Sequence, residues 1–440
     1  MYIKAMLFAG VACCGASLWA FSSVITDTKT DQDEQTGAVT VTYKLTGEDA
    51  VITADVQTNS VQNKAWASIG PANYTGMTGD VWKKVTADGS VRTISWPALA
   101  DGETKPPTFD KHVRVVLTAW STNAPPDYLV INLNYNKSTP PAYYTDEALL
   151  PEGGSVTNKA YKEDQLVLKR MHAAGVTWMM SNDYVAKQGI NTVSCRRSSE
   201  IAHPVMLTHD YYIGVFEITE AQNAWIRGSA TIPDSRVAAK GMGFWAVRGS
   251  SKGTKFPSYK EDGSFDWETS YGTDDGYFVY YLRRRTKFPW IDIPTEAQWE
   301  FAARAGSRGV YYSGVTLSNL GEYARYSSNK GQADCEGKTG SIATVGSFKP
   351  NAFGLYDMIG NLAECTLDRV ENWSTCNNGG PIDANEVWVD PVGAKTGTNR
   401  CYAGGMYDWG DGYTYIGRRW DIAPAWDGGY SGVRVCLTLR

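Results

Sequence analysis

Residues 345–364 read VGSFKPNAFGLYDMIGNLAE and concentrate glycine, asparagine, acidic and aromatic residues without helical or strand periodicity. Asp357 and Glu364 place two carboxylates seven positions apart, on either side of Gly360 and Asn361. Carboxylate and main-chain carbonyl oxygens are the ligands that calcium takes in protein loops. The spacing therefore allows a calcium site. The alternative is a buried polar turn, because acidic residues in loops are more often simply solvated.

The histidines allow one other metal arrangement. His203 and His209 flank a short apolar run, and Asp210 follows the second histidine. Two histidines and one carboxylate form the facial set that holds non-haem iron. We favour a structural interpretation, because histidines at strand ends are common on surfaces and no helix fixes the spacing of these rings. A serine nucleophile is not supported either, since no G-x-S-x-G sequence is present.

Four motifs follow one another along the chain: YYIGVFEIT at Tyr211–Thr219, IPTEAQWE at Ile293–Glu300, the 345–364 loop, and GVRV at Gly432–Val435. Together they resemble the formylglycine-generating enzyme family, also called sulfatase-modifying factor domains. The resemblance extends from about Leu166 to Leu437. It implies an α+β fold that is compact, rich in loops and related to C-type lectins.

The resemblance also implies metal ligands. Members of the family bind calcium in the 345–364 loop, and the corresponding ligands here are the side chains of Asp357 and Glu364 and the main-chain oxygens of Gly360 and Leu362. A second family site would begin at Asn329 and the carbonyl group of Lys330. The run Asp334–Glu336 interrupts the family pattern beyond that point.

The family reaction depends on two cysteines in a C-x4-C pair, which hold copper and oxidise a substrate cysteine. Thiolates suit this task because they are soft ligands for Cu(I). Aligning Tyr413–Ile422 with the family places Tyr415 and Trp420 at the two cysteine positions. No C-x4-C pair occurs in the chain. We therefore expect the family fold without copper and without the inherited reaction.

Of the eight cysteines, six would remain after cleavage of the expected signal segment: Cys195, Cys335, Cys365, Cys376, Cys401 and Cys436. An even number in an exported chain permits disulfides, and six cysteines allow fifteen connectivities. No grouping of cysteine and histidine suits zinc. The family places the strand motifs beside Cys401 and Cys436 next to one another, so this resemblance favours a disulfide between these two.

Residues 406–431 interleave aromatic residues with aspartate and glycine, a composition typical of binding surfaces. The candidate ligand contacts are Tyr407, Trp409, Tyr413, Trp426 and Tyr430. We expect Trp409 and Trp426 to be exposed, whereas Trp420 suits core and surface equally. Aromatic rings with acidic neighbours suit carbohydrates or cationic peptides. Some proteins of this fold are diversified by retroelements in this segment, and the pattern is compatible with that origin.

The N-terminal residues predict export. Lys4, the apolar run Ala5–Phe21 and the small residues near Ser23 are typical of a secretory signal over residues 1–23. The apolar run is about seventeen residues long, shorter than the usual membrane span. We therefore expect a secreted or cell-envelope protein without a stable membrane span. A net charge of −5 with interspersed signs argues against a nucleic-acid partner.

Period-two alternation of apolar residues predicts strands between Val39 and Leu133, separated by turn residues such as Asp88-Gly89. This pattern is typical of an all-β sandwich resembling immunoglobulin or fibronectin modules, over residues 24–137. Residues 138–157, with Pro140-Pro141 and Gly153-Gly154, are expected to form a linker, and residues 158–440 the second domain.

Two helices are predicted in the second domain. Thr219 can cap one that begins at Glu220, and Thr295 can cap another over Glu296–Arg304. The basic run Arg283–Arg285 is expected to be a solvated turn. Taken together, the sequence predicts a calcium-stabilised ligand-binding or scaffold module with an extracellular protein, peptide or glycan partner. The alternatives are a formylglycine-generating oxidoreductase with a non-standard site and a diversified lectin-fold binding protein.

Overall fold

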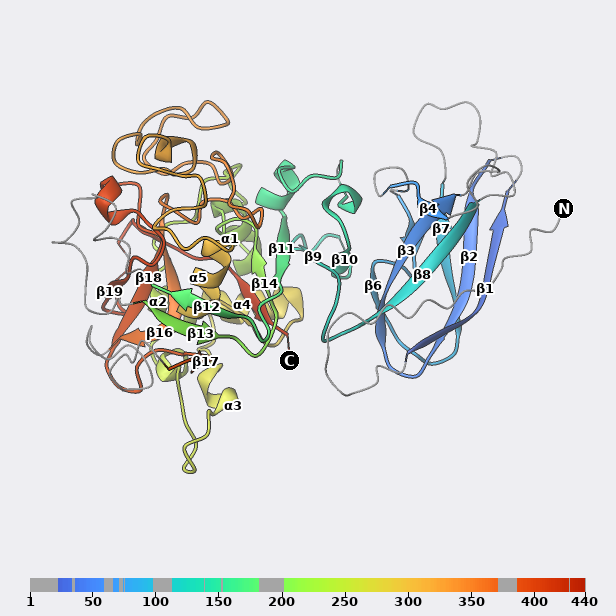
Figure 1. Ribbon diagram of the computed structural model, residues 1–440, viewed down its shortest axis with the longest axis horizontal. Helices are drawn as coiled ribbons and strands as arrows, with labels where there is room; N and C mark the ends of the chain where they lie inside the picture. The colour runs from blue at the N-terminus through green and yellow to red at the C-terminus, as the bar shows by residue number, and fades with distance from the viewer. Residues whose placement is uncertain are drawn as a thin grey trace. The chain divides into compact units, whose positions relative to one another are not determined.

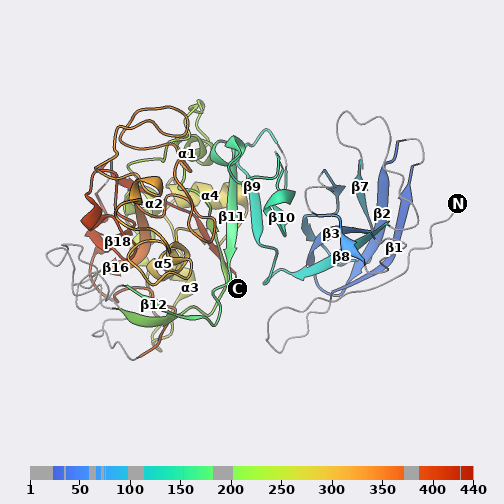
Figure 2. The same ribbon diagram turned by 45° about the horizontal axis from the view of Figure 1, so that its top comes forward.

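The computed structural model describes residues 23–33, 36–58, 66–70, 74, 76–97, 113–137, 139–151, 153–181, 202–370, 386–426 and 428–439. The chain forms two compact units, Met1–Ile131 with Thr139–Asn158 and Asn132–Ser138 with Lys159–Arg440 (Figures 1 and 2). Residues 1–22, which hold almost all of the expected signal segment, lie outside the described residues.

The N-terminal unit contains two antiparallel sheets. The first has the strand order β1-β2-β7-β5 and the second the order β4-β3-β6, with β8 also paired to β3. Their bounds are β1 Val24–Gln32, β2 Val39–Thr46, β3 Ala50–Thr58, β4 Ala67–Ser68, β5 Thr78–Gly79, β6 Lys83–Val85, β7 Val91–Trp96 and β8 Val113–Ser121. The expected period-two pattern is clear in β2, whose alternate residues from Val39 to Leu45 are buried.

Apolar side chains of both sheets meet in one core. Val41 and Tyr43 of β2 belong to the same buried cluster as Ile52 and Val56 of β3. Strand β9 (Tyr128–Asn132) pairs with β10 (Ala142–Tyr144), and a 3₁₀ helix, η2, spans Glu147–Leu149. Strand β10 and helix η2 both lie within residues 138–157, the segment expected to be a linker.

The main sheet of the C-terminal unit joins segments from both ends of that unit. It contains β11 (Gln165–Met171), β14 (Tyr211–Gly214), β21 (Cys436–Thr438) and β15 (Ile291–Asp292), and all the pairs between these strands are antiparallel. Strand β14 lies in the first sequence motif, and β21 follows the last one. Their pairing therefore brings the first and fourth motifs together.

Two further sheets complete the unit. One has the order β19-β18-β16-β20, and the other the order β12-β13-β17. The bounds are β16 Ala363–Val370, β18 Asn399–Ala403, β19 Trp420–Ile422, β20 Ser431–Gly432, β12 Thr177–Met180, β13 His203–Met206 and β17 Trp388–Val389. Strand β16 continues the 345–364 loop directly, so the sheet fixes the end of that loop.

Both predicted helices are present. Helix α1 (Glu220–Arg227) and helix α5 (Glu296–Arg304) both begin with a capping box. In each, the hydroxyl of the cap threonine, Thr219 or Thr295, accepts from a main-chain N–H of the first turn. The side chain of the glutamine at that position accepts from the main-chain N–H of the threonine. Helix α5 packs against β16 and β18, and its Trp299 is almost fully buried, as expected. Three helices were not predicted: α2 (Phe244–Arg248), α3 (Trp267–Ser270) and α4 (Phe278–Thr286). The 3₁₀ helices among the described residues of the C-terminal unit are η3 (Lys159–Lys162), η6 (Lys252–Lys255), η7 (Leu320–Glu322) and η8 (Asp411–Tyr413).

Two sequence predictions are wrong. Arg283–Arg285 is the last turn of α4, not a solvated turn, and Arg283 is partly buried, where it donates to Asp292 at 2.8 Å. No disulfide joins Cys401 to Cys436, because Cys401 lies on β18 and Cys436 on β21, in different sheets. Cys195 and Cys376 lie outside the described residues. No helix among the described residues is long and apolar enough to span a membrane.

Candidate functional site

A buried ion pair joins all four sequence motifs. Arg434 of the last motif donates to Glu364 with Nη2 at 2.7 Å, and to the main-chain oxygen of Gly214 in the first motif at 2.9 Å. The indole N–H of Trp299, in the second motif, donates to Glu364 Oε2 at 2.7 Å. Burial alone would lower the pKa of Arg434, but Glu364 raises it above its ordinary value. The guanidinium of Arg434 therefore stays charged inside the protein.

The 357–364 loop needs unusual main-chain geometry. Asp357, Gly360 and Asn361 have φ angles of 58°, 80° and 56°, in the left-handed region. A Cβ atom at Gly360 would lie 2.1 Å from the carbonyl oxygen of Arg325, so only glycine fits there. The side chain of Asn361 donates to Glu217 Oε2 at 2.5 Å and accepts from the N–H of Ala343. These contacts hold the loop in one shape.

The two carboxylates expected to bind calcium differ in whether their oxygens already accept hydrogen bonds. Asp357 Oδ2 accepts from the N–H of Gly346 at 2.6 Å, whereas its Oδ1 is buried without a hydrogen-bond partner. Burial raises the pKa of Asp357 to about 6. Such an unsatisfied carboxylate oxygen fits a cation ligand. Both oxygens of Glu364, in contrast, already accept from Arg434 or Trp299.

The residues of the second expected site are engaged in a turn. Asn329 Oδ1 accepts from the N–H of Tyr326 at 2.8 Å, and its amide donates to the carbonyl of Ala324. The guanidinium of Arg325 donates to the main-chain oxygen of Asn329, while the side chain of Lys330 pairs with Asp408. Among the described residues, no three histidine, cysteine or acidic side chains form a group that could hold a metal. The side chains of Asn329 and Lys330 are thus already engaged, whereas Asp357 has one carboxylate oxygen without a hydrogen-bond partner.

The three residues considered for iron do not converge. His203 is buried in β13, with its ring centroid 4.2 Å from that of Trp388. His209 contacts the Thr208 hydroxyl, and Asp210 pairs with Arg170 at 2.6 Å. Each side chain thus serves a different neighbour, and the iron arrangement is wrong.

Seven aromatic residues form a connected set that we call the aromatic cluster: Tyr402, Tyr407, Trp409, Tyr413, Trp420, Trp426 and Tyr430. The centroid of Trp420 lies 4.8 Å from that of Trp409, 5.2 Å from that of Trp426 and 6.2 Å from that of Tyr402. Trp409 contacts Tyr413 at 6.2 Å, and Trp426 contacts Tyr430 at 6.4 Å. Tyr430 in turn contacts Tyr407 at 5.5 Å. All five rings expected to contact a ligand are therefore brought together.

Exposure within the aromatic cluster differs from the expectation. Trp409 and Trp426 are half-buried because each packs against Trp420, whereas Tyr413 is 42% exposed. The buried guanidinium of Arg418 lies against two of these rings, with its central carbon 5.6 Å from the centroid of Trp409 and 5.4 Å from that of Tyr413. Trp420 lies at the centre of the aromatic cluster, because the pairing of β18 with β19 places it opposite Tyr402. The sequence did not decide whether Trp420 belongs to the core or to the surface. Tyr415, the other residue aligned with a family cysteine, is buried.

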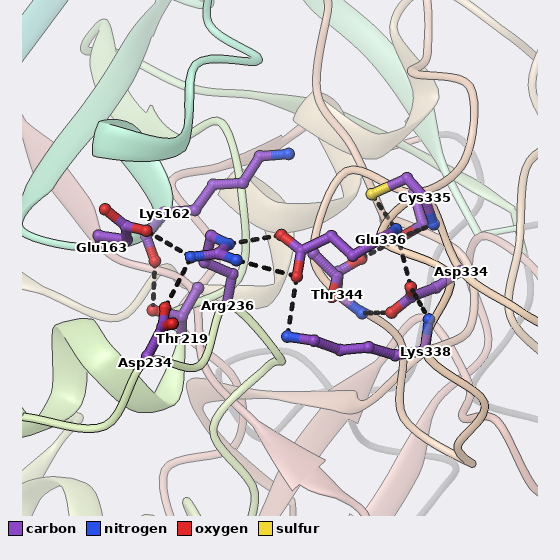
Figure 3. Close-up of polar contacts among 11 residues, drawn as sticks. Lys162, Glu163, Thr219, Asp234, Arg236, Asp334, Cys335, Glu336, Lys338 and Thr344 are labelled. Carbon is purple, nitrogen blue, oxygen red and sulfur yellow. Dashed lines mark hydrogen bonds and ion pairs between the residues drawn. The ribbon is translucent and has the colours of Figure 1, made fainter.

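A charged network holds the loop that follows Asn329. Figure 3 shows Arg236 between Glu163 and Asp234 on one side and Glu336 on the other. Asp334 accepts from the N–H groups of Lys338 and Thr344, both at 2.9 Å. The run Asp334–Glu336, which interrupts the family pattern, is therefore a turn fastened to the rest of the unit.

Comparison with known proteins identifies the family of the C-terminal unit. The model of the sulfatase-modifying factor enzyme 1-like domain matches residues 173–439, more than half of the chain. The chain therefore belongs to this family, and the resemblance inferred from the four motifs is confirmed. The C-terminal unit, rich in sheet and loops, has a formylglycine-generating-enzyme-like fold.

Individual relatives match shorter segments. The chain is 32% identical over 127 residues to mouse formylglycine-generating enzyme, covering 28% of this chain and 32% of that protein. It is 35% identical over 123 residues to the enzyme of that name from Thermomonospora curvata, covering 26% and 38%. A bovine protein named inactive C-alpha-formylglycine-generating enzyme 2 is 35% identical over 82 residues, covering 18% and 27%. The chain thus spans about a third of the length of these relatives.

Two solved structures have a similar chain trace. Treponema denticola variable protein 1 is 20% identical with a TM-score of 0.41, covering 62% of this chain and 95% of that one. PvdO from Pseudomonas aeruginosa is 18% identical with a TM-score of 0.44, covering 62% and 94%.

Proposed function

We propose that the protein is an exported ligand-binding or scaffold protein that contacts an extracellular protein, peptide or glycan through the aromatic cluster. The observation that carries this proposal is the continuous contact of seven rings, most of them half-buried. A half-buried ring is held rigidly by its neighbours and still offers a face or edge to a ligand. Binding therefore costs little side-chain entropy.

Polar groups at the rim suit hydroxyl groups or peptide amides. Asp408 pairs with Lys330, and Asp411 begins η8 with its side chain exposed. Carboxylates accept from hydroxyl or amide groups while the rings contact apolar faces, as in aromatic-lined binding sites generally. The site would thus bind by combining ring contact with a few polar contacts.

The proposal is tested by ligand capture with the purified protein on glycan and peptide arrays. We expect saturable binding that weakens at least tenfold in Trp409→Ala and Trp426→Ala. Trp290→Ala is the matched control, because Trp290 is 39% exposed and lies outside the aromatic cluster. Equal binding by all of these variants, each shown to be folded, would refute a role for the aromatic cluster.

We also propose that the family reaction is absent, because Tyr415 and Trp420 stand where the family alignment places the cysteines. The relatives named formylglycine-generating enzyme would then share the fold and not the chemistry with this chain. The relative named as inactive shows that the family name alone does not imply the reaction.

Calcium is proposed to stabilise the 345–364 loop. Asp357 Oδ1 would serve as a ligand together with the carbonyl groups of Gly360 and Leu362, and Glu364 would have to exchange contacts with Arg434 to join them. The ion would supply positive charge to a buried carboxylate. We expect calcium to raise the unfolding temperature of the wild type and not of Asp357→Ala. An equal effect on both would exclude this site.

For the N-terminal unit we propose an immunoglobulin-like or fibronectin-like sandwich that spaces or docks the C-terminal unit. Support comes from the two antiparallel sheets and their common core. Export is proposed from the N-terminal residues. Mass spectrometry of the protein secreted by its host, showing a mature chain that begins near residue 24, would test this.

A further inference from the structure

A small pocket lies in the C-terminal unit, and no residue of the aromatic cluster lines it. It has a volume of about 40 Å³ and is bordered by the β13–β14 connection, α3, the start of α5, the loop after β17, and β21. A water molecule needs roughly 10–15 Å³ of such volume, so the pocket accepts a group of a few heavy atoms.

Asp390 places a carboxylate in the wall of the pocket. Its Oδ1 accepts from the N–H of Thr208 at 2.9 Å, and its Oδ2 accepts from the Thr208 hydroxyl. Within the described ranges its carboxylate forms no ion pair. Asp390 also has a φ of 44°, a conformation that is costly for a residue other than glycine and that concentrates at functional sites.

The same threonine fixes the ring of His209. Thr208 Oγ1 lies 2.7 Å from His209 Nδ1. Because the hydroxyl gives its single proton to Asp390, it can only accept from the imidazole, so Nδ1 carries the proton. His209 lines the pocket beside Asp390.

Aromatic faces form another part of the wall. Trp267 is stacked on Tyr271 with centroids 5.7 Å apart and an interplanar angle of 25°, and it is 39% exposed. The side-chain amide N–H of Gln298, also in the lining, already donates to Thr438 Oγ1 at 2.9 Å. Among the described residues that line the pocket, there is no lysine or arginine. A carboxylate and aromatic ring faces together attract a cation.

We propose that this pocket binds a primary ammonium group, supplied either by a lysine side chain of a partner protein or by a free small amine. An ammonium is a compact point charge with three donors, which suits the small volume, whereas a planar guanidinium needs more room. This site is independent of the proposed ligand surface at the aromatic cluster.

The test uses the full chain and two probes, n-butylammonium and the peptide acetyl-Gly-Lys-Gly-amide, titrated by calorimetry or by ligand-observed NMR. We expect saturable binding that weakens at least tenfold in Asp390→Asn and in Trp267→Ala. Acetylation of the lysine Nε should abolish it. Trp245→Ala is the matched control, because Trp245 is 37% exposed, close to the 39% of Trp267, and does not line the pocket.

The two probes distinguish the sources of the ammonium group. Peptide binding at least tenfold tighter than that of n-butylammonium assigns the site to a protein lysine, and weaker discrimination assigns it to a free amine. The proposal is overturned if neither probe saturates, or if the folded Asp390→Asn and Trp267→Ala proteins bind as the wild type does. Asp390→Asn removes the negative charge and keeps the shape of the side chain. Circular dichroism of this variant and of the wild type shows whether the fold is retained, so a loss of binding by the folded variant is due to the loss of charge.

Discussion

The guanidinium of Arg434 and the carboxylate of Glu364 form a buried ion pair between residues that lie 70 positions apart in the sequence. Trp299 donates to the same carboxylate, and Arg434 also donates to the main chain at Gly214 and Tyr356. Neither charge reaches solvent. The pair therefore fastens the loop after Asp357 to the main sheet and to α5.

Removing one partner of this pair should be strongly destabilising. Glu364→Gln removes the direct ion-pair partner of the buried Arg434 charge, and breaking a buried pair in this way costs about 3–5 kcal/mol in comparable cases. Urea unfolding of the wild type and the variant measures the difference. The exposed pair Lys349–Glu322 provides the control, because Glu322→Gln should change the free energy of unfolding by less than about 1 kcal/mol. Similar costs for the two variants would contradict the proposed role of the buried pair.

Acid should release the network in Figure 3. Arg236 lowers the pKa of Glu336 to about 2. A lowered carboxyl pKa contributes stability that is fully present above the unfolded value near 4.5 and is lost as the pH falls through about 2. We expect the wild type to lose more stability than Arg236→Gln between pH 5 and pH 2.5. The measurement is the difference between their unfolding temperatures at each pH, and a constant difference would refute the linkage.

Asp368 should have the opposite pH dependence. Its Oδ2 accepts from the N–H of Glu296 at 2.6 Å, at the start of α5, and burial followed by repulsion from Glu296 raises its pKa to about 8. A raised carboxyl pKa means that the folded protein holds a proton that the unfolded chain releases. Its contribution to stability therefore falls as the pH rises from about 4 to about 8.

The variant Asp368→Asn removes this titration. We expect its unfolding temperature to gain on that of the wild type as the pH is raised from 5 to 8.5. Asp262→Asn is a control, since Asp262 is exposed and contacts Ser264 in a turn. If Asp368→Asn follows the wild type across this range, Asp368 is ionised in the folded protein.

Sequence reasoning succeeded where the determinants are local. The caps of α1 and α5 depend on residues three positions apart, and the motif at Asp357–Glu364 depends on residues within one loop. Sequence reasoning failed where a residue contacts another that is distant in the sequence, and where a short helix ends in basic residues. The burial of Arg283 depends on Asp292 in β15, and the central place of Trp420 depends on the pairing of β18 with β19. The position of Cys401 relative to Cys436 is likewise set by sheet topology, which spacing does not reveal.

Within the aromatic cluster, the centre and the rim should respond differently to truncation. Trp420 contacts three other rings, so Trp420→Ala leaves a cavity and should destabilise by about 3 kcal/mol, near the lower end for large aromatic truncations. Tyr413→Ala removes an exposed ring and should cost less than about 1 kcal/mol. Chemical unfolding of both variants tests this. Equal costs would show that the rings do not pack as one unit.

An assay for oxidation of a substrate cysteine distinguishes the proposed binding function from the activity that several relatives are named for. A peptide with a C-x-P-x-R sequence is incubated with the purified protein, copper and oxygen, and mass spectrometry follows conversion of the thiol to an aldehyde. We expect no conversion above a control without protein, because the chain has no C-x4-C pair and Tyr415 and Trp420 cannot supply thiolates. A relative named formylglycine-generating enzyme serves as the positive control. Conversion by the folded protein would place catalysis at other residues, and Cys365 and Cys401 could then be examined by replacing each with alanine.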